Sequence, residues 1–227
     1  MNWKLKAKIQ NIISLIPGRS SYEVYYWLQR IFGGLKTINP TSELIAAINL
    51  WGKIKELNYE PREKVFFEVG TGRTPILPLA LWLMGAKRII TVDINPYLKE
   101  KLIRESIKYI KNNRNEVKRL FGNLLDSDRF EILMNFYQAD FFNLHSFFIT
   151  FSIDYVAPGD ASNTNLNNQS IDFHISFNVL EHIPSVSLNK IIKEGNRITK
   201  HSGLFIHYID YSDHFWHSDK SISPINF

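Results

Sequence analysis

The sequence predicts an α/β fold in which a parallel β-sheet carries helices on both faces. From Val65 onward, short apolar runs alternate with stretches of helical periodicity, the order that builds a parallel sheet covered by helices. The run at 65–69 ends in the turn Gly70-Thr71-Gly72, and the run at 88–92 ends in Asp93. This order of strand, glycine turn, helix, strand and acid predicts a nucleotide pocket at the strand ends.

The composition is that of an ordinary globular protein, with 44% hydrophobic and 22% charged residues in a chain of 227. This length favours one sizeable core. The absence of cysteine excludes disulfides, thiolate catalysis and cysteine-based zinc sites. We expect no integral membrane segment, because the longest apolar runs are about half of what a bilayer requires, and no secretory leader is visible. A cytoplasmic protein is the resulting expectation.

The net charge of +5 is concentrated near the N-terminus. Residues 1–36 hold six basic residues and one acid, whereas the rest of the chain holds 21 residues of each sign. The main domain therefore lacks the basic surface of a nucleic-acid-binding protein, and we expect no nucleic-acid partner.

Residues 1–57 predict three helices that form an N-terminal cap. Helical spacing of apolar residues marks 3–16, a capping box opens the stretch 20–32, and an Asn-Pro pair opens the third helix at 40–54. The alternative interpretation of the lysine-rich first helix is a membrane-surface contact by residues 1–16.

Residues 58–227 predict the sheet domain. After the strand at 65–69 we expect a helix at 75–84, a strand at 88–92 and a helix that begins at Asn95-Pro96 and continues to Ile107. Residues 112–152 are interpreted as an insertion or an elongated helical segment. The expected elements after them are strands at 153–157 and 171–177, a helix at 187–200 and a strand at 204–209.

The glycine turn limits the kind of nucleotide that fits. Glycine lets a ligand lie against the backbone, with free amides of the following helix in reach. A nicotinamide or flavin fingerprint places a third glycine three residues after Gly72, and this chain has Pro75 there, which disfavours an NAD-dependent oxidoreductase. Asp93 lies 21 residues after Gly72, where a carboxylate can accept hydrogen bonds from both ribose hydroxyls.

Four motifs in this order resemble the class I S-adenosylmethionine-dependent methyltransferases over about residues 62–214. They are Glu68-Val69-Gly70-Thr71-Gly72, Thr91-Val92-Asp93, Asp160 after the third strand, and the run from Ile171 through Asn178-Val179-Leu180-Glu181-His182-Ile183. The resemblance is closest to bacterial small-molecule, methyltransferase type 11-like enzymes. It implies a Rossmann-like methyltransferase sheet and S-adenosyl-L-methionine as cofactor.

By that resemblance, the glycines face the methionine and ribose portions of the cofactor, and Glu68 helps to hold its amino group. Asp93 binds the ribose, Asp160 and Ala161 contact the adenine edge, and Asn178 lies beside the methionine end. The implied cofactor-binding set is Glu68, Gly70, Thr71, Gly72, Asp93, Ile94, Asp160, Ala161 and Asn178.

Methyl transfer from a sulfonium needs alignment of the acceptor, exclusion of water and, for some acceptors, a base. No metal is required, and none is predicted. The candidate catalytic residues follow strands four and five, where ligands bind in open α/β sheets. They are His182, Glu181, His207 and Asp210. His207 lies within its expected strand, so the competing interpretation is a hydrogen-bonded core histidine.

The C-terminal strands of the expected sheet are incomplete, because only 18 residues follow Ile209. An uncovered sheet edge invites pairing with another chain, so a homodimer is one expectation. The sequence thus predicts methyl transfer to an oxygen or nitrogen of a small-molecule acceptor, such as a sugar or glycan precursor. The alternative is a catalytically inactive module that binds S-adenosylmethionine or serves as an assembly subunit.

Overall fold

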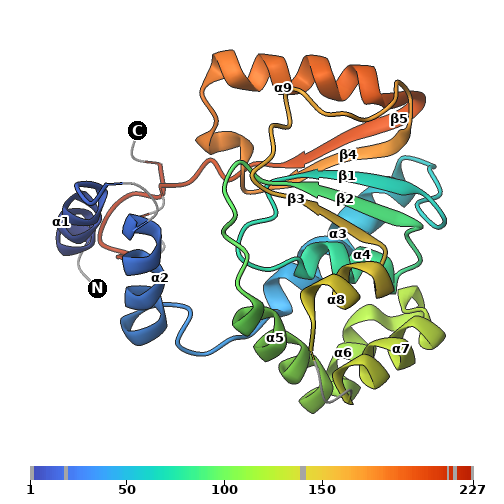
Figure 1. Cartoon of the computed structure of the whole chain (residues 1–227), viewed down its shortest axis with the longest axis horizontal. Helices are drawn as coiled ribbons and strands as arrows, with labels where there is room; N and C mark the ends of the chain where they lie inside the picture. The colour runs from blue at the N-terminus through green and yellow to red at the C-terminus, as the bar shows by residue number, and fades with distance from the viewer. Residues whose placement is uncertain (1–2, 18–19, 139–141, 214, 217–218, 226–227) are drawn as a thin grey trace. The chain divides into compact units, whose positions relative to one another are not determined.

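The computed structural model describes residues 3–17, 20–138, 142–213, 215–216 and 219–225 (Figure 1). The chain divides into two compact units. The sheet unit is Asn39–Tyr208, and the terminal unit combines Met1–Ile38 with Ile209–Phe227. None of the helices in the described ranges is long and apolar enough to cross a membrane.

The sheet unit is built on five parallel strands in the order β3-β2-β1-β4-β5. Their bounds are β1 Val65–Val69, β2 Arg88–Val92, β3 Ile153–Val156, β4 Ile171–Phe177 and β5 Thr199–Tyr208. The first strand is central, and the chain order reverses between β1 and β4. Such a reversal places a crevice at the carboxyl ends of the two strands on either side of it. The predicted α/β fold is confirmed.

Helices cover both faces of this sheet, but unequally (Figure 1). The helices on the larger face are α3 Thr41–Glu56, α4 Ile76–Leu83, α5 Glu100–Asn112, α6 Arg114–Phe121, α7 Ser127–Gln138 and α8 Leu144–Thr150, with the short η1 Gly122–Leu124. The opposite face carries α9 Ser185–Ile198, and η2 Leu180–His182 precedes it.

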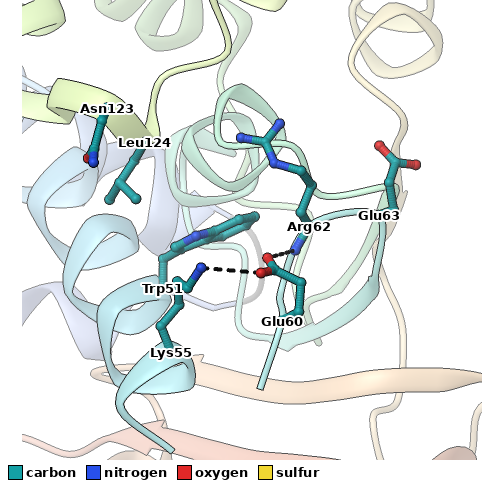
Figure 2. Close-up of a pocket in the computed structure, with 7 residues that line it drawn as sticks. All are labelled: Trp51, Lys55, Glu60, Arg62, Glu63, Asn123 and Leu124. Atoms are coloured by element: carbon teal, nitrogen blue, oxygen red, sulfur yellow. Dashed lines mark hydrogen bonds and ion pairs between the residues drawn. The ribbon is translucent and has the colours of Figure 1, made fainter. Parts of the chain in front are cut away.

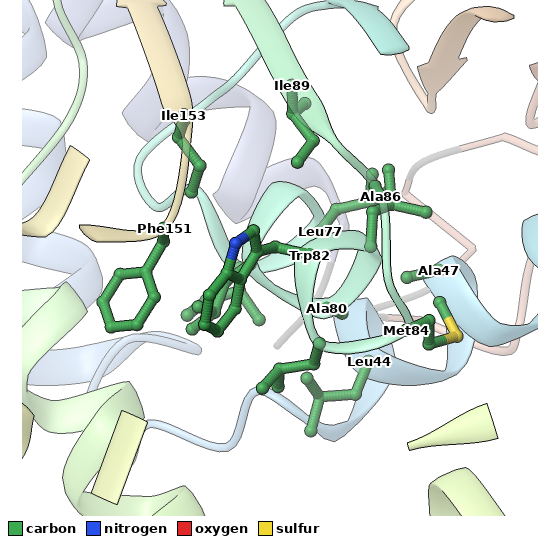
Figure 3. Packing of buried hydrophobic residues seen from close by; sticks show 14 of the residues in the cluster. Leu44, Ala47, Leu77, Ala80, Trp82, Met84, Ala86, Ile89, Phe151 and Ile153 are labelled. Atoms are coloured by element: carbon green, nitrogen blue, oxygen red, sulfur yellow. The ribbon is translucent and has the colours of Figure 1, made fainter. Parts of the chain in front are cut away.

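The main core lies between the sheet and α4. Every residue of α4 is buried, because this helix packs against α3 as well as against the strands. Figure 3 shows Trp82 of α4 among Phe151, Ile89 and Ile153, with Leu44 and Ala47 of α3 on its other side. The Arg129 guanidinium donates to the carbonyls of Trp82 and Ala86 at 2.8 and 2.7 Å, which satisfies acceptors at the end of α4.

The terminal unit holds α1 Trp3–Ser14 and α2 Ser20–Phe32 together with the C-terminal segment. Ile13 of α1 and Tyr26 of α2 are its buried helical side chains. The backbone N–H of Trp3 donates to Asp219 at 3.0 Å, which ties α1 to the C-terminal segment. The unit is therefore assembled from the two ends of the sequence.

This division differs from the domain boundary predicted at residue 57. The third helix, α3, belongs to the sheet unit because Leu44, Ala47 and Ile54 are completely buried in its core. The segment predicted as an insertion or elongated helix, 112–152, is mostly helical where the structure describes it, with short non-helical stretches such as 125–126 and 142–143, and its apolar side chains extend the same core.

Predicted boundaries of three elements are wrong, namely those of α5, α9 and β5, the last of which begins five residues before the expected residue 204. The helix expected from Asn95 begins at Glu100, because Asn95 and Tyr97 form a turn and the Lys99 N–H donates to the Arg73 carbonyl at 3.0 Å. The helix expected to reach Lys200 ends at Ile198, and β5 begins directly at Thr199, which pairs with Ile171.

Candidate functional site

The glycine turn after β1 adopts a backbone that favours glycine at two positions. Gly70 has φ of 90° and Gly72 has φ of 67°, both in the left-handed region. A Cβ at Gly70 would lie 2.4 Å from Cγ2 of Val179, so the turn packs directly beneath the segment that follows β4. A Cβ at Gly72 would meet no atom within 4 Å, so this side of the turn is open. The turn thus presents accessible backbone at the strand ends.

Asp93 joins this turn to the end of β2. Its Oδ2 accepts a hydrogen bond from the Gly72 N–H at 2.8 Å, and its Oδ1 accepts one from the Asn95 N–H at 3.0 Å. The Asp93 carbonyl accepts from the Gly159 N–H at 2.9 Å, which adds the loop after β3. Burial raises the pKa of the Asp93 carboxyl, and the two N–H donors oppose that rise. One residue therefore organises three loops at the carboxyl edge of the sheet.

Glu68 lies in β1 opposite Thr91 of β2, and both side chains are buried. The Thr91 hydroxyl donates to Glu68 Oε2, and it also shares a hydrogen bond with the Thr71 hydroxyl. Burial raises the pKa of Glu68 to about 8; the Thr91 hydrogen bond lowers it, and the charge of Asp93 raises it further. The site thus contains a carboxyl group that would ionise fully beside a cation.

The predicted adenine-side residues lie in the loops after β2 and β3. Ile94 is exposed next to Asp93. Asp160 is exposed and its Oδ1 accepts from the Ser162 N–H at 2.8 Å, whereas Ala161 is buried. Because Gly159 bonds to Asp93, these residues belong to the same edge of the sheet as the glycine turn.

The segment after β4 carries Asn178, Glu181 and His182. Asn178 is exposed with φ of 53°, and its N–H donates to the Tyr208 carbonyl at 3.0 Å. The His182 side chain is exposed, and Glu181 is partly buried. All three follow the carboxyl end of β4, beside the segment at Val179 that covers Gly70.

His207 lies within β5, and both of its ring nitrogens have partners. Nδ1 is 2.8 Å from the Ser176 hydroxyl, and Nε2 is 3.3 Å from Nδ1 of the fully buried His174. Burial lowers the pKa of His207 to about 4. Burial, followed by the charge of His207, lowers the pKa of His174 to about 3. These two imidazoles are therefore neutral near pH 7.

The structure brings the candidate residues together in part. Hydrogen bonds link Gly72 to Asp93, and Thr71 to Glu68 through Thr91. Asp210 belongs to the terminal unit, where its Oδ1 accepts from the Ser212 hydroxyl at 2.6 Å. Sequence reasoning missed Thr91 as a partner of Glu68, although each is the first residue of its motif.

A cavity of about 560 Å³ lies at the other end of the strands (Figure 2). It is lined by Trp51, Lys55, Glu60, Arg62, Glu63, Asn123 and Leu124. Glu60, Arg62 and Glu63 lie in the segment directly before β1, so the cavity is separated from the glycine turn by the length of that strand. Within the described ranges, no group of three or more His, Asp or Glu side chains could hold a metal ion.

Three solved structures illustrate what the chain is similar to. A putative S-adenosyl-L-methionine-dependent methyltransferase from Methanococcus maripaludis is 14% identical, with 90% of this chain and 69% of that one covered and a TM-score of 0.44. A putative methyltransferase from an antibiotic biosynthesis pathway of Anabaena variabilis is 19% identical, with 77% and 50% covered and a TM-score of 0.43.

The third is Haemonchus contortus phosphoethanolamine N-methyltransferase 1, solved with phosphoethanolamine and S-adenosylhomocysteine. It is 12% identical, with 86% of this chain and 33% of that one covered and a TM-score of 0.44. This chain thus spans half or less of the length of two of the three proteins. No curated protein matches it.

The family is identified by a sequence model rather than by these structures. The model of a methyltransferase domain matches residues 67–207, more than half of the chain, from within β1 to within β5. The strand order and the glycine turn beside an acidic residue agree with that match. The chain belongs to the class I S-adenosylmethionine-dependent methyltransferase family.

Proposed function

We propose that the chain binds S-adenosylmethionine at the carboxyl ends of β1, β2 and β4 and transfers its methyl group to an oxygen or nitrogen of a small molecule. The observation that carries the proposal is the hydrogen bond from the Gly72 N–H to Asp93, which fixes a buried carboxylate beside an open glycine turn. A sugar or glycan precursor is the acceptor class that we propose, and it rests on the sequence resemblance alone.

Asp93 is suited to hold the cofactor ribose. Each carboxylate oxygen can accept about two hydrogen bonds, and one backbone N–H occupies each oxygen. One acceptor position therefore remains on each oxygen for a ribose hydroxyl. The backbone donors also fix the carboxylate orientation before the ligand arrives, which lowers the entropy cost of binding.

Glu68 is suited to face the cationic amino group of the cofactor. Its raised pKa reflects burial without a neighbouring positive charge, and an ammonium group would favour the ionised form. The Thr91 hydroxyl orients the carboxyl group. We assign Thr71 and the backbone of Gly70 to the same methionine end, together with Asn178.

We assign the exposed Ile94, Asp160 and the buried Ala161 to the adenine end, because their loops meet at Asp93. When bound, S-adenosylmethionine supplies a methyl group that is already activated by its sulfonium. The residues of the chain then need only align the acceptor, exclude water and accept a proton where the acceptor carries one.

His182 is the base that we propose. Its ring is exposed after β4, whereas both nitrogens of His207 are engaged and the pKa of His207 is about 4, too low for an effective base near neutral pH. Glu181, from the same turn, serves to position the acceptor or His182. Asp210 lies in the terminal unit and stays a secondary candidate.

Calorimetry with S-adenosylhomocysteine tests the cofactor site. We expect Asp93→Ala to weaken binding by about 30-fold or more, because two hydrogen bonds to a charged acceptor are lost. Asp154→Ala is the matched control, since Asp154 is a carboxylate of the neighbouring β3 that pairs with Arg88 at the surface. Undiminished binding by Asp93→Ala would contradict the assigned role.

A methyl-transfer assay with a panel of hydroxyl and amine acceptors tests the catalytic proposal. We expect turnover by the wild type and a loss of about 100-fold in His182→Ala, the range of general-base contributions. His145→Ala is the control, because His145 is an exposed histidine of α8. Cofactor binding without transfer to any acceptor would favour the inactive-module alternative.

A further inference from the structure

The outer face of α2 is apolar and exposed. Val24, Trp27 and Ile31 recur at helical spacing, and Phe32 follows at the end of the helix. Trp27 is 55% exposed and Phe32 is 82% exposed. The unit's own packing uses the other side of the helix, where Tyr26 is buried. A stripe of large apolar side chains on one helix therefore faces outward in the structure.

The outer face of α1 combines apolar side chains with lysines. Leu5 and Ile12 are exposed, as is Leu15 in the turn after the helix, and Lys4 and Lys8 are exposed among them. Ile13, about 100° around the helix from Ile12, is buried. This alternation of lysine with exposed leucine and isoleucine is the pattern of a helix that lies in a membrane interface.

The charge of these two helices is positive. Residues 1–36 carry a net charge of +5 with Glu23 as their only acid. The C-terminal segment of the same unit adds three acids and one lysine. Asp219 accepts from the Trp3 N–H and Asp213 accepts from the Phe215 N–H at 2.6 Å, and hydrogen bonds from such uncharged donors do not cancel the charge of a carboxylate. With these acids counted, the terminal unit carries a net charge of +3, and its positive charge is concentrated in residues 1–36.

We propose that α1 and α2 form an interfacial anchor that binds the surface of an anionic phospholipid bilayer. Lysines between apolar residues can place their stems along the acyl boundary and their ammonium groups at the anionic headgroups. In a dry protein interface the same lysines would need acidic partners. Trp27 suits the headgroup level, where the indole ring is partly wet.

Vesicle co-sedimentation of the full chain tests this proposal. We expect binding to vesicles that contain phosphatidylglycerol and about 25-fold weaker binding to phosphatidylcholine vesicles, with a loss of about fivefold for each of Lys4→Gln and Lys8→Gln. Trp27→Ser with Phe32→Ser should weaken binding by about tenfold for each change. Ile149→Ser is the control, because Ile149 is 66% exposed on the sheet unit.

A fluorescence measurement gives a second, site-specific readout. The chain has no cysteine, so Phe32→Cys and, separately, Ile149→Cys each provide one site for an environment-sensitive dye. We expect anionic vesicles to shift the emission of the dye at position 32 to the blue and to leave the dye at position 149 unchanged. No sedimentation with anionic vesicles, or equal dye responses at the two positions, overturns the proposal. The proposal is also overturned if the chain does not bind vesicles but forms a dimer that Trp27→Ser with Phe32→Ser abolishes.

Discussion

The sheet holds two pairs of titratable side chains at buried or partly buried positions, and burial acts on their pKa values in opposite directions. Between β1 and β2, burial raises the pKa of Glu68 to about 8 and also raises that of Asp93. Between β4 and β5, burial lowers the pKa of His174 to about 3 and that of His207 to about 4. In both places the uncharged form is favoured, as expected for groups removed from water.

The surroundings of the two pairs differ. Asp93 lies at the strand ends beside the open side of Gly72. His174 lies within β4, stacked on Phe205 at 4.7 Å, and a Cβ on Gly195 of α9 would come within 2.8 Å of its ring. Glu68 could therefore gain its charge when a cationic ligand binds, whereas His174 is enclosed in the core and His207 is partly exposed. The ionisation of Glu68 would change when a cationic ligand binds, whereas the ionisation of His174 changes with pH.

The largest expected effect is acid destabilisation through His174. Its pKa is lower in the folded protein than the ordinary value of 6.5. As the pH falls below 6.5, the unfolded chain binds the proton first, so the free energy of unfolding decreases until the pH nears the folded pKa. We expect about 3 kcal/mol of loss from this residue between pH 7 and pH 4.

Urea denaturation of wild type and His174→Leu across this pH range measures that loss. Leucine has no titrating group, so the variant should show a shallower dependence on pH than the wild type does. Equal pH dependence in the two proteins would mean that His174 is accessible to protons in the folded state. The contrast between His174 and the carboxyl groups beside the glycine turn would then be wrong.

Glu68→Gln is expected to have the next largest effect, with the opposite dependence on pH. The folded pKa of Glu68 is above its ordinary value of 4.5, so this carboxyl group costs stability increasingly as the pH rises from 4.5 to about 8. In the ligand-free protein, we expect Glu68→Gln to raise the free energy of unfolding at pH 6 by about 2 kcal/mol and to change little at pH 4.5.

Thermal and urea unfolding of Glu68→Gln at both pH values provide the check, with Asp154→Asn as the exposed carboxylate control. A gain of equal size at both pH values would show that the substitution acts through packing rather than through ionisation.

Ser176→Ala is expected to cost less, about 1 kcal/mol. It removes the hydroxyl that lies 2.8 Å from Nδ1 of His207 and leaves that buried nitrogen without this partner. Chemical denaturation at pH 7 measures the cost, and Ser187→Ala at an exposed position of α9 is the control. A cost no larger than that of the control would place His207 in contact with water instead of in a closed network.

Arg88→Ala is expected to have the smallest effect, less than about 0.5 kcal/mol. The pair that Arg88 makes with Asp154 lies near the start of β2, at the opposite end of that strand from Asp93, and both side chains are about half exposed, at 54% and 44%. Denaturation of the wild type and Arg88→Ala in low and high salt measures this change in the free energy of unfolding. A cost well above 1 kcal/mol would show that exposed charges matter to this sheet as much as buried ones.

Patterns of local sequence predicted much of this fold. The bounds of β1, β2, β4 and α2 agree with the apolar runs and the capping box that predicted them. The start of α5 could not be predicted in the same way, because Asn95-Pro96 resembles a helix cap, and the turn that replaces it depends on hydrogen bonds to Asp93 and Arg73. The assignment of α3 to the sheet unit likewise depends on tertiary packing.

The candidate site shows the same limit. Glycine, aspartate and their spacing mark the turn after β1, so Gly72 and Asp93 can be read from the sequence. The link from Thr71 through Thr91 to Glu68 depends on the register of β1 against β2, which a single sequence does not reveal. Similarly, the partners of His207 are set by pairing of β5 with β4, where Ser176 and His207 lie opposite each other.

The central claim is that Glu68 and Asp93 receive a cationic cofactor. Calorimetry of S-adenosylhomocysteine binding at pH 7, repeated in buffers of different ionisation enthalpy, counts the protons that binding releases. With a pKa of about 8, Glu68 is about 90% protonated in the free protein at this pH. We predict that the wild type releases about 0.9 proton more than Glu68→Gln does. Equal proton release by the two proteins would contradict the account.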